Sequence, residues 1–262
     1  MMRIALGVEY DGSQFCGWQS QDGGVRTVQE CVEAALSRVA NHPVKVVCAG
    51  RTDTGVHATT QVIHFDSEVV REDKAWIMGV NTHLPKDICI HWMRSTGMDF
   101  HARFKAVRRH YRYVIFNSNA RPALLRDQVS WVHGNLDVLR MQQAAEYLLG
   151  EHDFTSFRAT ACQAHSPVRT IHHLTVERAG QYIMIDICAN AFLHHMVRNI
   201  VGVLLKVARV EREPEWVCEL LKVCDRTQAG MTAPAAGLYL TGVEYPAEFN
   251  LPCELLLPGF QT

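Results

Sequence analysis

The chain lacks the patterns that mark disulfide-stabilised, membrane-spanning or strongly basic proteins. Its nine cysteines are odd in number, irregularly spaced and without a CxxC pair, which argues against a disulfide framework or a zinc ribbon and fits a reducing cytosol. No apolar run approaches the roughly 18 residues that a spanning helix needs. The formal net charge is −1, so any positive surface for nucleic acid must be local. With 262 residues, 48% of them hydrophobic, the chain is long enough for one large or two smaller globular domains.

Signals for export, nucleotide phosphates and metals are also missing. The opening MMRIALGVEY has no basic start followed by a long apolar stretch, so we expect a cytoplasmic protein. DGSQFCGWQ lacks the GK[ST] ending of a phosphate-binding loop. The pairs His172-His173 and His194-His195 have no accompanying ligands at metal spacing, and adjacent residues on a strand face opposite ways. We therefore expect no metal site.

Hydrophobic periodicity predicts alternating strands and helices in the first part of the chain. The Thr27–Glu30 spacing is that of a capping box at a helix start. The predicted strands are 3–10, 44–49, 58–65 and 87–94, and the predicted helices are 27–41 and 71–80. This β-α-β-β-α-β order is that of a ferredoxin-like fold, in which helices cover one face of an antiparallel sheet.

The second part repeats this architecture without repeating the sequence. The predicted strands are 107–116, 168–178, 181–188 and 237–244, and the predicted helices are 137–149, 193–209 and 214–224. We predict an α+β protein of two ferredoxin-like (RRM-like) halves, 1–105 and 106–262. Their antiparallel sheets are expected to join around a central cleft, which is a usual place for a site.

A polar, glycine-flanked loop, GRTDTGVHA, separates the predicted strands 44–49 and 58–65. Gly50 and Gly55 allow the backbone to approach a ligand closely. Arg51 lies two positions before Asp53, and a guanidinium keeps a carboxylate ionised and oriented. An ionised aspartate is a competent nucleophile or general base. Composition alone leaves open an ordinary hairpin loop that Asp53 caps.

Residues 101–112, HARFKAVRRHYR, form a local basic segment that the net charge conceals. It contains Arg103, Lys105, Arg108, Arg109 and Arg112, no acidic residue, and the interleaved aromatics Phe104 and Tyr111, with Tyr113 just beyond. This mixture suits backbone phosphates together with an exposed base. The alternative is a solvated strand edge protected by basic residues. Arg158 and Arg169 flank the loop around Cys162 and are further candidates for phosphate contacts.

GRTDTGVHA resembles the catalytic motif of the tRNA pseudouridine synthase A family. Further strings resemble other motifs of that family, in the same order and over nearly the whole chain. They are YDGSQFCGWQSQ, DFHARFKAVRRHYRYVI, EHDFTSFRATACQAHSPVRTI, NAFLHHMVRNIVG and APAAGLYLTGVEY. The resemblance implies an enzyme that isomerises uridine at positions 38, 39 and 40 in the anticodon stem-loop of tRNA. It also implies that no metal or redox cofactor takes part, and that a homodimer binds one tRNA across both subunits.

The resemblance assigns roles to single residues. Asp53 corresponds to the catalytic aspartate, Arg198 to the arginine that pairs with it, Tyr111 to the tyrosine that stacks on the target base and Leu238 to an apolar residue of the uracil pocket. Taken without the resemblance, Tyr111 and Leu238 would be core residues of strands and Arg198 a solvated helix arginine. The apolar neighbours of Arg198 nevertheless favour a buried partner for it.

Four other residues are candidates for contacts with the substrate. Arg51 is expected to be structural or to bind phosphate, and His57 to contact RNA unless it is a neutral loop histidine. Arg109 and Arg158 are expected to bind phosphates.

The chemical route and two competing functions stay open at this point. Asp53 would attack C1′ as the base leaves, remove a proton at C2′, or attack C6 of the ring. A non-catalytic RNA-binding protein of paired ferredoxin-like folds would explain the basic segment and leave Asp53 without a role. An aspartate-dependent hydrolase of small nucleosides would explain Asp53 and leave the basic segment unused.

Overall fold

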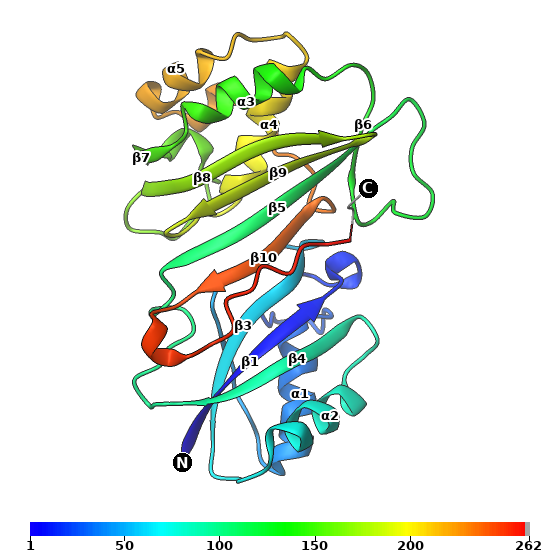
Figure 1. The fold of residues 1–262 in the computed structure, drawn as a ribbon, viewed down its shortest axis with the longest axis vertical. Helices are drawn as coiled ribbons and strands as arrows, with labels where there is room; N and C mark the ends of the chain where they lie inside the picture. The colour runs from blue at the N-terminus through cyan, green and yellow to red at the C-terminus, as the bar shows by residue number, and fades with distance from the viewer. Residues whose placement is uncertain (260–262) are drawn as a thin grey trace. The chain divides into compact units, whose positions relative to one another are not determined.

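The computed structural model describes residues 1–259, and the last three residues of the predicted second half lie outside this range. The chain forms two compact units. The first contains Met1–Val107 and Tyr239–Pro258, and the second contains Arg108–Leu238. Figure 1 shows that each unit combines helices with strands, and most strand pairs are antiparallel. The predicted α+β class is therefore confirmed.

The first unit follows the predicted element order. Its elements are β1 (Met2–Tyr10), α1 (Val28–Ala40), β2 (Val47–Cys48), β3 (His57–Ser67), α2 (Asp73–His83), β4 (Ile88–Thr96) and most of β10 (Leu238–Glu244). β1 pairs antiparallel with both β4 and β3, β2 pairs antiparallel with β3, and β10 lies parallel to β3. The predicted strand 44–49 is reduced to two residues. The predicted strand 237–244 is β10, where Tyr239 is the partner of His57.

Burial explains why β1 and α1 form where they do. Ile4, Ala5 and Leu6 are all buried, as expected of a strand with a partner on each side and cover on both faces. The side chain of Thr27 accepts a hydrogen bond from the Glu30 N–H at the start of α1, so the predicted cap is confirmed. Asn41 ends the helix with a left-handed backbone, φ 56°.

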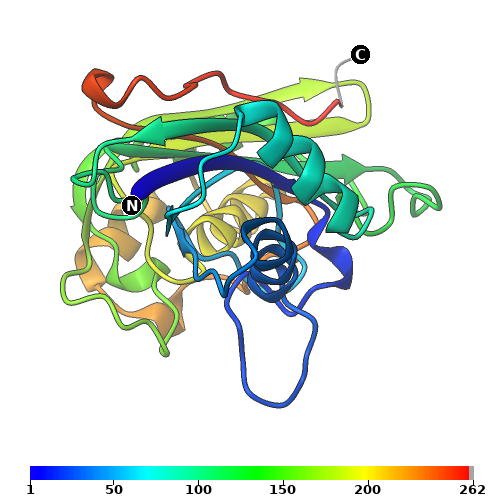
Figure 2. The same ribbon diagram turned by 90° about the horizontal axis from the view of Figure 1, so that it is seen from below.

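The two faces of the first unit's strands have different cover. Figure 2 shows α1 on one face and the segment after β10 on the other. On that second face the Thr59 hydroxyl donates a hydrogen bond to the Leu256 carbonyl. Phe100 is fully buried, and its ring lies 5.1 Å from that of Tyr245 and 5.2 Å from that of Phe249. The segment after β10 therefore completes the core of this unit.

The second unit is built around one buried helix. Its elements are β5 (Arg108–Asn117), β6 (Ser130–Val132), α3 (Val138–Glu146), β7 (Gly150–Asp153), β8 (Val168–Ala179), β9 (Tyr182–Ala189), α4 (Met196–Ala208) and α5 (Trp216–Val223). The strands follow the antiparallel order β5-β9-β8-β7, with β6 parallel to β5. Eleven residues of α4 are buried, which fits its apolar sequence MVRNIVGVLLKVA.

Short 3-10 helices complete the described chain. They are η1 (Gly12–Gln14), η2 (Thr155–Phe157), η3 (Arg226–Gln228) and η4 (Ala247–Phe249). None of the helices within residues 1–259 has both the length and the apolar character needed to cross a membrane.

Candidate active site

The loop that carries Asp53 is held by the segment that follows β1. Trp18 donates its backbone N–H to the Thr52 carbonyl at 3.0 Å, and the hydroxyls of Tyr10 and Thr52 lie 2.7 Å apart. On the other side of Asp53, the Val56 N–H donates to the Asp53 carbonyl at 3.1 Å. These contacts fix the backbone on both sides of the carboxylate.

Two glycines make this close packing possible. A Cβ atom at Gly12 would lie 2.0 Å from the Val56 carbonyl oxygen, so no side chain fits there. A Cβ at Gly17 would lie 2.8 Å from the Thr52 carbonyl oxygen, and Gly17 also has φ +85°. The glycines of YDGSQFCGWQ therefore bring its backbone against the loop of the GRTDTGVHA motif.

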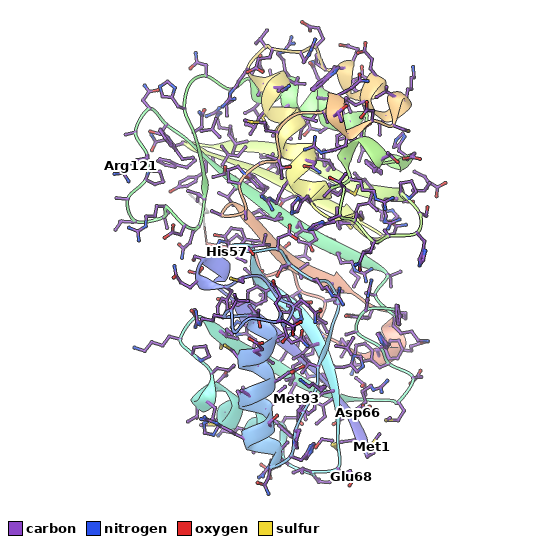
Figure 3. All side chains as sticks on the ribbon, turned by 180° about the vertical axis from the view of Figure 1, so that it is seen from behind. Met1, His57, Asp66, Glu68, Met93 and Arg121 are labelled. Atoms are coloured by element: carbon purple, nitrogen blue, oxygen red, sulfur yellow. The ribbon has the colours of Figure 1, made fainter. Side chains whose placement is uncertain are left out.

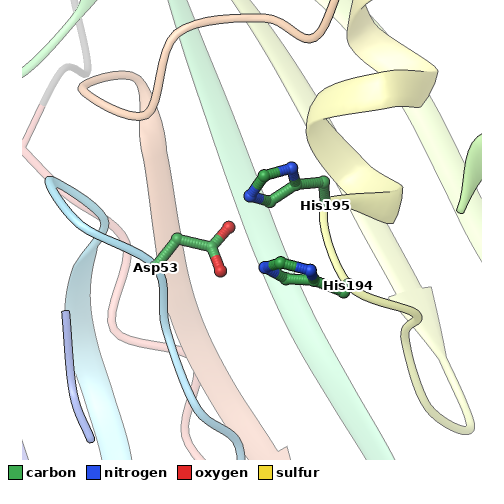
Figure 4. A group of neighbouring side chains, drawn as sticks. All are labelled: Asp53, His194 and His195. Carbon is green, nitrogen blue, oxygen red and sulfur yellow. The ribbon is translucent and has the colours of Figure 1, made fainter. Parts of the chain in front are cut away.

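The Asp53 side chain projects from this loop and is half-buried (Figure 4). Thr52 before it is buried, whereas Arg51 and Thr54 are exposed. An oriented carboxylate that solvent still reaches can act as a nucleophile or base toward a ligand that closes over it. The exposure of Arg51 is compatible with a phosphate contact.

His57, at the start of β3, is buried (Figure 3). Its Nδ1 accepts a hydrogen bond from the Gly12 N–H at 3.0 Å and lies 3.2 Å from the Asp11 carboxylate. Its ring stacks on that of Tyr239 at 4.7 Å. Burial, followed by the negative charge of Asp11, raises the pKa of Tyr239. His57 thus supports the segment that holds the Asp53 loop.

The structure distinguishes the two tyrosines of β5. Tyr113 is fully buried and its hydroxyl donates to the Pro234 carbonyl at 2.8 Å, and burial raises its pKa. Tyr111 is 9% exposed, and its ring meets that of Phe192 edge-on at 5.0 Å. Tyr113 therefore has the contacts of a core residue, and Tyr111 has those of a residue at the margin of the core.

Arg198 lies in the first turn of α4 and is half-buried. Its Nε donates to the Ala233 carbonyl at 2.8 Å, and the Ala233 N–H donates back to the Arg198 carbonyl at 3.1 Å. This reciprocal pair sets the direction of the guanidinium.

The segment 230–238 is itself fixed by a polar network on α4. The Asn199 amide oxygen accepts hydrogen bonds from the Arg226 guanidinium at 3.0 Å and the Thr232 hydroxyl at 2.7 Å, and its amide nitrogen donates to the Phe157 carbonyl at 2.8 Å. A Cβ at Gly202 would lie 1.8 Å from the Met231 carbonyl oxygen. The segment thus lies directly on the backbone of the helix.

The same segment reaches the start of β10. The Gly237 carbonyl accepts a hydrogen bond from the Val114 N–H at 2.8 Å, and the Leu238 N–H donates to the Ala235 carbonyl at 2.8 Å. Leu238 is buried. Sequence reasoning missed the role of 230–238, although its small residues and Gly237 are the signal of close backbone packing.

The basic residues of the segment 101–112 differ in their exposure to solvent. Arg112 is buried and binds Asp186 with two hydrogen bonds of 2.7 and 2.6 Å, so its inclusion in an exposed patch was wrong. Arg103, Lys105 and Arg108 are exposed. Arg109 is half-buried and donates to the Asn190 carbonyl at 2.8 Å.

Arg158 and Arg169 organise the loop around Cys162. Arg158 donates to the Cys162 carbonyl at 2.6 Å, and Arg169 donates to the Ser166 carbonyl at 2.9 Å. Burial lowers the pKa of Arg169. Although burial opposes the change, backbone N–H groups of Ala164 and His194 and the charge of Arg158 lower the pKa of the Cys162 thiol.

His194 and His195 lie in a turn before α4, with their rings 4.0 Å apart (Figure 4). The expectation that these two side chains face opposite ways was wrong, because the backbone here is not a strand. His195 has φ 61°, and this left-handed residue begins the helix. The pair His172-His173 does lie in a strand, β8.

The Asp53 carboxylate is carried by a loop with a fixed backbone, and the Arg198 guanidinium has a fixed direction. A family model described as tRNA pseudouridine synthase matches residues 7–105 and 144–246. These ranges include Asp53, Arg198 and Leu238, and Tyr111 lies between them. The chain therefore belongs to the tRNA pseudouridine synthase family.

Curated relatives match over nearly their whole length. The tRNA pseudouridine synthase A of Alcanivorax borkumensis is 57% identical, over 98% of this chain and 97% of its own. That of Vibrio cholerae is 59% identical, over 96% of this chain and 95% of its own. That of Photobacterium profundum is 56% identical, over 99% of this chain and 99% of its own. Among solved structures, a chain titled as part of a Cbf5-Nop10-Gar1 complex has a TM-score of 0.41 and 14% identity. That match covers 90% of this chain and 48% of the other.

Proposed function

We propose that this chain isomerises uridine to pseudouridine at positions 38, 39 and 40 in the anticodon stem-loop of tRNA. Family membership supports the reaction and the tRNA substrate. The resemblance of the motifs supports the anticodon positions. The observation that carries the proposal is the half-buried Asp53 carboxylate on a loop whose backbone is fixed on both sides.

Asp53 is the proposed catalytic residue in each of three routes. In the first, a carboxylate oxygen bonds to C1′ while the C1′–N1 bond breaks and its electron pair leaves with the uracil anion. C5 of the rotated base then bonds to C1′, the carboxylate leaves, and C5 loses its proton. In the second, Asp53 takes the C2′ proton while the C1′–N1 bond breaks, which gives a glycal and a uracil anion. C5 of the rotated base then bonds to C1′, the proton returns to C2′, and C5 loses its own proton. In the third, a carboxylate oxygen adds to C6 across the C5=C6 bond, and it leaves again after the C1′–N1 bond has broken and C5 has bonded to C1′. Each route needs an oriented carboxylate, which the fixed loop supports.

Arg198 is the proposed partner of the Asp53 carboxylate. The motif NAFLHHMVRNIVG supports this role, and so does the reciprocal contact with Ala233 that orients the guanidinium. A guanidinium beside a carboxylate favours its ionised form and fixes its geometry.

Tyr111 and Leu238 are the proposed contacts of the uracil. Tyr111 stacks on the base, and an aromatic face offsets part of the cost of taking a nucleotide out of its stack. The core contacts of Tyr113 support the choice of Tyr111 between the two. Leu238 lines the pocket with apolar surface.

Basic side chains are the proposed contacts of the tRNA backbone. The exposed Arg51 and the half-buried Arg109 and Arg158 contact phosphates. For His57, its burial favours support of the Asp53 loop over a direct contact with RNA.

We extend the proposal to the architecture and assembly. The strand order β4-β1-β3, with β2 beside β3, supports a ferredoxin-like first half, 1–105. A second such half, 106–262, and a cleft between the halves remain part of the proposal. The motif resemblance supports a homodimer that binds tRNA across both subunits, and a tRNA substrate supports a cytoplasmic location.

The test is incubation of the protein with unmodified tRNA transcripts, followed by mapping of pseudouridine. Pseudouridine at positions 38, 39 and 40 is expected. Binding without modification would favour a non-catalytic RNA-binding protein, and release of free uracil would favour a hydrolase.

A further inference from the structure

The turn between β4 and β5 exposes a large aromatic side chain. Phe104 is 75% exposed, in a unit whose other phenylalanines are buried. An exposed aromatic ring does not gain the stabilisation that burial would give it. A rigid turn that holds such a ring in solvent therefore indicates an interaction surface.

The ring of Phe104 is held in place by His101. The two rings stack at 4.3 Å with 25° between their planes. Nδ1 of His101 accepts hydrogen bonds from the N–H groups of Arg103 and Phe104, both at 3.2 Å, and its carbonyl accepts from the Lys105 N–H at 3.0 Å. Burial, followed by the charge of Arg3, lowers the pKa of His101, which keeps the ring neutral as its acceptor role requires.

The turn is also fixed to the first unit's sheet. Arg3 donates to the Phe100 carbonyl at 2.7 Å and forms an ion pair with Asp66, whose position is marked in Figure 3. The Ala102 N–H donates to Nδ1 of the buried His64 at 3.1 Å. The turn 101–105 therefore presents Phe104 from a rigid base.

Charge around the ring favours a polyanion as the occupant. Arg103 and Lys105 on either side of Phe104 are exposed, and 101–112 contains no acidic residue. The Arg103 guanidinium lies 5.7 Å from the centre of the Phe104 ring. Two copies of a positively charged surface would repel each other across a symmetric contact, which disfavours a second copy of this chain.

We propose that Phe104, backed by His101, is a stacking platform for an unpaired base of the tRNA other than the target uridine, and that Arg103 and Lys105 contact the flanking phosphates. Single-stranded nucleotides are bound by this combination of aromatic faces and basic side chains. The inference rests on the proposed function, because that function makes tRNA the ligand.

The experiment measures binding of unmodified tRNA by fluorescence anisotropy for the wild type, Phe104→Ala, Phe104→Leu and Phe104→Trp. Phe104→Ala is expected to raise Kd about tenfold, a size typical of one lost stacking contact. Phe104→Leu keeps apolar surface without a flat ring and should also bind weakly, whereas Phe104→Trp should bind like the wild type. Leu139→Ala, at a 77% exposed apolar residue of the second unit, is the matched control and should leave Kd unchanged.

Further measurements separate this inference from the proposed function. At saturating enzyme, where all the tRNA is bound, the single-turnover rate of Phe104→Ala should equal that of the wild type, because the platform is not at the reacting uridine. Failure of the wild type to form pseudouridine would overturn the proposed function, while the binding series would still test the platform. The proposal of a stacking platform is overturned if Phe104→Ala binds tRNA with the affinity of the wild type. It is also overturned if this variant alters the sedimentation of the free protein and leaves the tRNA affinity unchanged, because Phe104 would then contact another protein copy.

Discussion

The two proposed catalytic side chains are held in different ways. In the first unit, the Asp53 loop is held largely by backbone contacts with the segment after β1, at distances that only glycine permits at Gly12. In the second unit, Arg198 is oriented by the segment 230–238, which side-chain hydrogen bonds of Asn199 and Arg226 fix to α4.

This difference predicts different tolerance to substitution. A Cβ at Gly12 would lie only 2.0 Å from the Val56 carbonyl oxygen, so no side chain fits there. Even the smallest substitution at Gly12 should therefore displace the Asp53 loop. A network of side-chain hydrogen bonds loses its contribution in steps, and conservative replacements should restore part of it.

The largest effect is expected from Gly12→Ala. The new Cβ would collide with the Val56 carbonyl and displace the loop, so the free energy of unfolding should fall by about 2–3 kcal/mol. Turnover should fall at least 100-fold, because an error of about 1 Å in the position of a reacting group costs that much. Thermal unfolding and single-turnover assays measure both. Gly79→Ala is the matched control, because its Cβ would meet only the Val39 side chain, at 3.3 Å.

Asn199→Ala tests the support of the second unit. It leaves the Arg226 guanidinium, the Thr232 hydroxyl and the Phe157 carbonyl without this partner, and we expect a loss of about 2–3 kcal/mol of stability. The rate of the chemical step should fall while tRNA affinity stays near that of the wild type. An unchanged single-turnover rate in a destabilised Asn199→Ala would show that the network does not position Arg198.

Acid should act on the first unit through His64. Burial, followed by the charges of Arg3 and His101, lowers the pKa of His64 from about 6.5 to about 4. The unfolded chain therefore binds more protons than the folded one between these values, and the stabilisation present above pH 6.5 is lost as the pH falls. At pH 5 the expected loss is about 1–2 kcal/mol. Hydrogen exchange in β3 at pH 7 and pH 5 measures it, and His64→Asn should remove the difference.

Thr232→Val should have the smallest effect, about 1 kcal/mol, because it removes one hydrogen bond to Asn199 and keeps the shape of the side chain. We expect a lower kcat with an unchanged KM for tRNA. Thr232→Ser, which keeps the hydroxyl, should restore kcat. Equal kcat values for the valine and serine variants would show that the hydrogen bond from Thr232 to Asn199 does not help to position Arg198.

Local sequence patterns predicted the elements whose determinants are local. The Thr27 cap, the apolar strand β1 and the apolar helix α4 follow from neighbouring residues. The short strands β6 and β7, SWV and GEHD, have too few residues to show a period. The position of β10 beside β3 depends on residues far apart in the chain, which periodicity does not record.

The same limit applies to the candidate site. The composition of the loop around Asp53 marked it as unusual, but the fit of Gly12 against Val56 joins residues 44 positions apart in the numbering and required the fold. In the sequence Arg112 does not differ from its exposed basic neighbours. Its burial depends on Asp186, which lies opposite it on the adjacent strand and accepts its hydrogen bonds. The predicted helix 193–209 included both histidines, but the chain turns at His194 and His195 and the helix begins at Met196.

The most direct measurement is tritium release from tRNA labelled at uridine C5, with wild type, Asp53→Asn and the exposed control Asp22→Asn compared at saturating enzyme. We expect no release by Asp53→Asn, because a neutral amide cannot act as nucleophile or base. We also expect normal release by Asp22→Asn, and a tRNA affinity of Asp53→Asn within about threefold of the wild type. Release by Asp53→Asn at the wild-type rate would contradict the proposed catalytic role of Asp53.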